Sequence, residues 1–177
     1  FIKEKDLVKK MTEDIDEMER MLNEYLDFAK GQKSEKTEQI NMVNLLQDIV
    51  NKYHGKNVYF VFEKNIEFNG RHNSLKRCLS NLIDNALAYG TKVEISLKKT
   101  MNNILLYIED DGPGIPEKEI ENVFKPFYRV DKSRSQNKSG VGLGLSISND
   151  IVRAHGGNIS LQKSYMNGLR VKISLPY

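Results

Sequence analysis

Residues 81–90 read NLIDNALAYG and close a helical segment that starts near Leu75. Its apolar residues recur at steps of three and four, which is the spacing of a helix face that packs against a core. Two asparagines, Asn81 and Asn85, lie one turn apart in this helix, although the asparagine amide competes for backbone groups and weakens helices. Two solvated amides are the ordinary explanation, so the rest of the sequence decides whether they do more. The apolar positions are Leu75, Cys78, Leu79, Leu82, Ile83 and Ala86.

The composition is that of an ordinary soluble domain. The chain has 177 residues, of which 39% are hydrophobic, and a net charge of +3 from 27 basic and 24 acidic residues. This excess is too small to indicate nucleic acid or an anionic membrane surface as a partner.

The single cysteine, Cys78, excludes an intramolecular disulfide and a Cys-rich zinc site, and its place on the apolar stripe predicts a buried side chain. The chain has no signal peptide and no apolar run that could span a bilayer, which predicts a soluble chain, and its start at Phe1 indicates a fragment of a larger protein.

Residues 1–30 carry a heptad pattern between charged residues. Their apolar positions alternate in steps of three and four, as in helices that pack side by side in a bundle. A lone helix cannot bury such a face, so partner helices outside the chain are predicted, and the alternative is packing on the rest of the chain. The polar run at 31–41, GQKSEKTEQIN, predicts a linker, which puts a second domain at 42–177. The seam consists of Val8, Met11, Ile15, Met18, Leu22, Tyr25 and Ala29.

The second domain reads as alternating helices and strands. Helical periodicity covers 42–53, the segment around Asn81, and 143–155. Apolar and polar residues alternate, as in strands, at 57–63, 92–98, 103–109, 158–163 and 169–175. Because too few helices are present to cover both faces of a sheet, the pattern predicts an α/β fold, a two-layer sandwich with a mixed sheet and helices on one face.

The long irregular segment at 110–140 has glycine-rich sequences at both ends. At its start, DDGPGIP places Asp110 at the end of a strand, and Gly112 and Gly114 allow close approach of a ligand to the backbone, although an ordinary turn can have this composition. At its end, SGVGLGLSI precedes an apolar helix whose first N–H groups favour phosphate. The sequence matches neither the Walker nor the dinucleotide pattern. Basic residues between the two ends either contact phosphate or form a solvated loop.

Four motifs together identify a family. NLIDNALAYG, DDGPGIP, FKPFYR and GVGLGL occur in this order between residues 81 and 145. They resemble the N box, first glycine box, F box and second glycine box of sensor histidine kinases, whose catalytic domain has the Bergerat (GHKL) ATPase fold, and the resemblance covers 42–177. Residues 1–30 resemble the second helix of that family's dimerisation and phosphotransfer hairpin. The sequence of residues 76–90 is most similar to that of the osmosensor (EnvZ-like) subgroup.

The resemblance implies a role for several side chains. The position of Asn85 gives its amide oxygen to the Mg²⁺ that bridges the nucleotide phosphates, and Asn81 supports it from the same helix face. The position of Asp110 accepts a hydrogen bond from the adenine amino group. Tyr89 and Ile115 are the expected walls of the adenine pocket.

The resemblance also implies a lid and a phosphate-binding loop. Phe124 and Phe127 correspond to the F box, whose aromatic residues anchor the lid. The expected contacts in the lid are Arg129, Val130, Lys132 and Arg134. The glycine boxes contribute Gly112, Gly114, Gly140, Val141, Gly142, Leu143, Gly144 and Leu145, mostly through backbone groups.

The chain departs from the family pattern in two places. Ala88 occupies a position where many relatives carry a basic residue, so lid cations are expected to substitute for it. The family's phosphoacceptor histidine is followed by an acidic residue, a basic residue and a proline, and His54, His72 and His155 all lack this context. The acceptor is therefore expected on a helix upstream of Phe1.

The predicted function is the ATP-binding catalytic part of a two-component sensor kinase, with ATP and Mg²⁺ as ligands. The parent protein would transfer the γ-phosphoryl group to a histidine for relay to a response regulator, dimerise through its helical hairpin, and expose this domain to the cytoplasm from a bacterial inner membrane. No nucleic-acid partner is expected. Two alternatives are an ATP-driven conformational ATPase of the gyrase and chaperone type, and a protein serine kinase or nucleotide-binding regulator.

Overall fold

A computed structural model of the chain describes residues 35–62, 65–130 and 142–177, together with separate positions between Leu7 and Leu26. The chain forms two compact units, Phe1–Ser34 and Glu35–Tyr177. The described positions of the first unit are helical, and the seam residues Met11, Ile15 and Met18 are exposed. Within the described residues, no helix combines the length and the apolar character needed to cross a bilayer.

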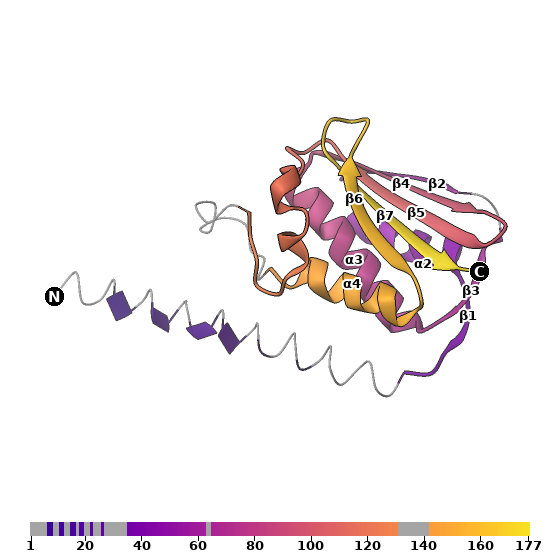
Figure 1. The fold of residues 1–177 in the computed structure, drawn as a ribbon, viewed down its shortest axis with the longest axis horizontal. Coiled ribbons are helices and arrows are strands. Elements are labelled where there is room, and N and C mark those ends of the chain that lie inside the picture. Colours follow the sequence, from indigo (N-terminus) through magenta and orange to yellow (C-terminus); the bar gives the residue numbers. More distant parts are fainter. Residues whose placement is uncertain are drawn as a thin grey trace. The chain divides into compact units, whose positions relative to one another are not determined.

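The second unit contains a five-stranded sheet (Figure 1). The strand order is β2-β4-β5-β7-β6, in which only β2 and β4 are parallel. In β4, Val93, Ile95 and Leu97 are buried and alternate with polar residues, because successive side chains of a strand point to opposite faces. The strands are β2 Asn57–Phe62, β4 Lys92–Lys99, β5 Asn103–Asp110, β6 Asn158–Lys163 and β7 Leu169–Pro176.

Helices cover one face of this sheet, as Figure 1 shows. They are α2 (Met42–Val50), α3 (His72–Tyr89) and α4 (Gly144–Ala154). The entire apolar stripe of α3 predicted from the sequence is buried. The predicted two-layer sandwich with a mixed sheet is therefore confirmed.

The interface between α3 and α4 buries the cysteine. Cys78 is 1% exposed, and Ser148 of α4 donates its hydroxyl to the Cys78 carbonyl over 3.3 Å. Burial raises the pKa of the Cys78 thiol to about 12. The prediction of a buried side chain is confirmed.

The structure differs from the predicted linker at 35–41, and residues 31–34 lie outside the described residues. Residues Glu38–Asn41 form β1, which pairs antiparallel with β3 (Glu67–Gly70), and the sequence analysis predicted neither strand. Glu35 accepts hydrogen bonds from the N–H and hydroxyl of Ser74, at 3.0 and 2.6 Å, and so caps the first turn of α3. The second unit thus begins at Glu35 and not at Met42. The sequence analysis missed β1 and β3 because strands of four residues are too short to show alternation.

Candidate functional site

Asp110 lies at the end of β5 and is 4% exposed. Its Oδ1 accepts hydrogen bonds from two backbone N–H groups, Gly112 at 2.8 Å and Leu169 at 3.1 Å. None of the described residues donates to Oδ2. Burial raises the pKa of Asp110, although the two N–H groups oppose this effect by stabilising the charged form. One oxygen is thus fixed by the protein, and the other is available to a donor on a ligand.

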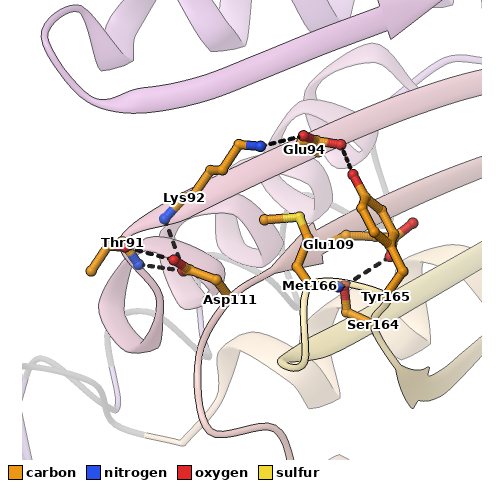
Figure 2. Close-up of polar contacts among 8 residues, drawn as sticks. All are labelled: Thr91, Lys92, Glu94, Glu109, Asp111, Ser164, Tyr165 and Met166. Carbon is orange, nitrogen blue, oxygen red and sulfur yellow. Dashed lines mark hydrogen bonds and ion pairs between the residues drawn. The ribbon is translucent and has the colours of Figure 1, made fainter.

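The neighbouring carboxylate, Asp111, has a structural role that the sequence analysis missed. It accepts hydrogen bonds from the hydroxyl and N–H of Thr91, each at 2.6 Å, and from the N–H of Lys92 at 2.9 Å (Figure 2). The Thr91 hydroxyl and these backbone donors lower the pKa of Asp111 to about 2. Asp111 therefore fastens the first glycine turn to the beginning of β4. Composition and periodicity do not distinguish the two adjacent aspartates, and only the family resemblance singled out Asp110.

One face of α3 runs past both glycine-rich segments. A Cβ atom built on Gly144 would lie 3.8 Å from Cβ of Asn81, and one built on Gly112 would lie 2.9 Å from the carbonyl oxygen of Tyr89. Asn81 therefore lies beside the first residue of α4, and Tyr89 lies beside the turn that follows Asp110. The structure brings together, along one helix, the two glycine boxes that the sequence separates.

The two asparagine amides are available to a ligand. Asn81 and Asn85 are partly exposed, and neither side chain makes a hydrogen bond with the described residues. Tyr89 is 43% exposed on the same helix. Within the described residues, no three His, Cys, Asp or Glu side chains gather into a metal-binding cluster. Amide oxygens are hard ligands of the kind that Mg²⁺ binds, so the two asparagines are the residues that could hold this ion.

The F box lies against the second glycine box. The N–H of Phe127 donates to the Gly142 carbonyl over 3.0 Å, and Gly142 has a φ of +77°. A Cβ atom at Gly142 would lie 2.9 Å from the Tyr128 carbonyl oxygen, so glycine is required there by both backbone angle and space. Phe127 is 57% exposed, and the buried residue of this turn is Val123. The anchoring role expected of Phe124 and Phe127 stays a prediction.

The remaining positions of the second glycine box and the lid are placed only in part. Leu143 is buried directly before α4, and Gly144 and Leu145 form its first turn. Arg129 is partly exposed and Val130 is exposed. The predictions for Lys132, Arg134, Gly140 and Val141 concern positions outside the described residues.

A cavity of about 580 Å³ lies between the first glycine turn and the hairpin of β6 and β7. It includes Gly114 and Ile115, which the sequence analysis placed in the site, but also hairpin residues that it did not consider. Gly114 has a φ of +69°, which allows the turn to curve around this space. The cavity is lined by Pro113, Gly114, Ile115, Pro116, Glu117, Ile120, Gln162, Lys163, Asn167, Gly168 and Leu169.

His155 closes α4 and is a structural residue. Its Nε2 accepts a hydrogen bond from the Arg71 N–H over 3.0 Å, and its Nδ1 donates to the Ile151 carbonyl over 2.7 Å. This pairing requires the neutral ring, and burial lowers the pKa of His155 below its ordinary value of 6.5. With both ring nitrogens in use, His155 is not suited to accept a phosphoryl group.

Comparison with known proteins agrees with this geometry. Residues 70–177 match the family described as histidine kinase-, DNA gyrase B-, and HSP90-like ATPase. The chain belongs to this ATPase family. The matched region contains α3, the Asp110 turn and the start of α4, so the three parts of the candidate site all lie in the ATPase domain.

Several proteins that are similar to this chain are named as sensor histidine kinases. GtrS of Pseudomonas aeruginosa is 36% identical over 178 residues, which cover 99% of this chain and 37% of GtrS. The structure of the mycobacterial sensor histidine kinase MprB is 26% identical, with a TM-score of 0.68, and is matched over 79% of this chain and 97% of MprB. The solution structure of the histidine kinase domain of the Escherichia coli osmosensor EnvZ is 29% identical, with a TM-score of 0.63, over 81% of this chain and 91% of that domain. The chain thus spans little more than a third of GtrS, and its assignment to the EnvZ-like subgroup stays a prediction.

Proposed function

We propose that this chain is the ATP-binding catalytic part of a two-component sensor histidine kinase. The observation that carries the proposal is the Asp110 carboxylate, which is buried, held at Oδ1 by two N–H groups, and without a donor from the described residues at Oδ2. An oxygen of this kind suits the exocyclic amino group of adenine. Because phosphoryl transfer depends mainly on positioning and charge stabilisation, a domain that binds and orients ATP supplies most of what the reaction needs.

We infer that Mg²⁺ accompanies the nucleotide. The amide oxygen of Asn85 would be its ligand from the protein, and Asn81, one turn earlier, would support the phosphate end of the site. Asn81 lies beside Gly144, where the first N–H groups of α4 and the positive end of the helix dipole favour phosphate. A single amide is sufficient, because Mg²⁺ takes its other ligands from phosphate and water.

For the parent protein, we propose transfer of the γ-phosphoryl group to a histidine outside this chain, followed by relay to a response regulator. GtrS and MprB bear the name sensor histidine kinase, which supports this reaction. The exposed apolar side chains of Met11, Ile15 and Met18 support a helical partner for the first unit, as in a dimer of helical hairpins. Anchorage in a bacterial inner membrane, with this domain in the cytoplasm, belongs to the same proposal.

Calorimetric titration of two variants with ATP tests the site. Asp110→Ala is expected to reduce ATP affinity roughly 10-fold to 150-fold, because a hydrogen bond to a charged group contributes about 1.5–3 kcal/mol. Asp48→Ala is the control, since this exposed carboxylate belongs to α2, which carries no residue of the site, and its loss should leave ATP affinity unchanged. Unchanged ATP affinity in Asp110→Ala would overturn the assignment.

A further inference from the structure

The hairpin between β6 and β7 is fastened to β5 through a buried cluster. Ser164, which is 3% exposed, donates its hydroxyl to Oε2 of Glu109 over 2.9 Å and accepts the Met166 N–H over 3.0 Å. The other carboxylate oxygen of Glu109 forms an ion pair with Arg170 at 3.0 Å. Figure 2 marks the contact between Ser164, which follows β6, and Glu109 of β5 with a dashed line. The cluster joins the two ends of the hairpin turn to the residue directly before Asp110.

A second set of contacts joins the same hairpin to Asp110. The N–H of Leu169 donates to Oδ1, and the Gly168 backbone lies directly against the aspartate. A Cβ atom at Gly168 would lie 2.3 Å from the Asp110 carbonyl oxygen, 2.4 Å from Oδ1 and 2.5 Å from the Gly112 nitrogen. Gly168 does not have a positive φ, so it is the lack of space, and not the backbone angle, that requires glycine.

These contacts determine which carboxylate oxygen a ligand can use. Both N–H donors bond to Oδ1, so rotation of the carboxyl group would leave the buried Leu169 N–H and the partly buried Gly112 N–H without their acceptor. The Leu169 N–H is in place only while the turn keeps its shape, in which the Ser164 N–H donates to the Gly168 carbonyl over 2.9 Å. Glu109, buried at 8% exposure, is in turn satisfied by Ser164 and Arg170.

We propose that the β6–β7 hairpin is a positioning element for the nucleotide base: Glu109, Ser164 and Arg170 fix the hairpin, and its Gly168–Leu169 backbone holds Asp110 with Oδ2 directed to adenine. Gly168 and Ser164 are therefore positioning residues that act through Asp110. The inference rests on the proposed role of Asp110 in binding ATP. The inference makes the β6–β7 hairpin a determinant of nucleotide affinity, although its Leu169 lies 59 residues from Asp110 in sequence.

The test is a double-mutant cycle on the whole chain, read by ATP and adenosine binding. Gly168→Ala is expected to reduce affinity for both ligands about tenfold or more, and to have no further effect in the Asp110→Ala background, because residues that act as a unit are not additive. The pH dependence of ATP binding should also change in this variant. Loss of the Leu169 N–H raises the pKa of Asp110, so as the pH is lowered the variant should lose ATP at a higher pH than the wild type does.

Gly157→Ala is the matched control for steric damage. Its Cβ atom would lie 2.5 Å from the Ser174 carbonyl oxygen, at the opposite end of the β6–β7 pair, so it should lower stability while the folded protein keeps its ATP affinity. If Gly168→Ala does not fold, Ser164→Ala takes its place in the cycle, with Ser164→Thr as the variant that keeps the hydroxyl and restores affinity.

The outcomes separate this inference from the proposed function. Loss of affinity in Asp110→Ala, combined with wild-type affinity in the folded Gly168→Ala and Ser164→Ala variants, would refute the positioning role alone. Full additivity of the Gly168 and Asp110 substitutions would refute it as well. Wild-type affinity in Asp110→Ala itself would instead refute the nucleotide site on which the inference rests.

Discussion

Replacing His155 with alanine is expected to lower the free energy of unfolding and to remove part of its dependence on pH. The ring joins the end of α4 to the residue that precedes α3, through the Arg71 N–H at 3.0 Å and the Ile151 carbonyl at 2.7 Å. Two hydrogen bonds of about 0.5–1.5 kcal/mol each, together with about 1 kcal/mol for the half-buried ring, predict a loss of about 2–4 kcal/mol in the free energy of unfolding. Urea denaturation near pH 7.5 measures this loss.

The pH dependence follows from the lowered pKa of His155. Below pH 6.5 the unfolded chain binds a proton at this site and the folded chain does not, so the unfolded state gains stability as the pH falls. The contribution of the neutral ring is therefore complete above pH 6.5 and is lost as the pH falls from 6.5 through the folded pKa, at no more than about 1.4 kcal/mol per pH unit. His155→Ala should show a shallower decline than the wild type over this interval.

The exposed His54 provides the control for loss of an imidazole, because His54→Ala should leave the stability at pH 7.5 close to that of the wild type. Stability curves for the wild type and His155→Ala that run parallel between pH 7.5 and 5.5 would refute the reasoning.

Three further predictions concern the ligand, the thiol and the reaction. Asn85→Ala should weaken binding of ATP in the presence of Mg²⁺ far more than binding of adenosine, which has no phosphates to bridge; equal losses in calorimetry would mean that Asn85 is structural. Cys78, 1% exposed and with a pKa of about 12, should react with a thiol reagent only as the protein unfolds, and rapid labelling of the native protein would contradict its burial. Incubated with γ-labelled ATP, this chain should not label itself, because His155 uses both ring nitrogens and the other two histidines lack the family's acceptor context; a phosphorylated histidine in the isolated chain would show that an acceptor had been overlooked.

Local sequence patterns determined most of the architecture of the second unit. The apolar stripe of α3, the five long strands and α4 were all predictable, because periods of 3.6 and 2 residues reflect burial on one face. The glycine-rich motifs also marked backbone turns, in which Gly114 and Gly142 have positive φ values, while the approach of a ligand to them stays a prediction. The resemblance to a family, and not periodicity, singled out Asp110.

Only the tertiary structure showed the different surroundings of Asp110 and Asp111. The two residues have the same side chain and adjacent positions, yet burial raises the pKa of the first, and the Thr91 hydroxyl with backbone donors lowers the pKa of the second. The same holds for Glu35, which caps α3 from 39 residues away, and for the β6–β7 hairpin, whose Leu169 lies 59 residues from the aspartate it holds. In each case the partner is supplied by a segment distant in sequence, so a local pattern carries no trace of it. Burial and hydrogen bonding arise only when the sheet forms and brings the ends of β4, β5 and β7 together.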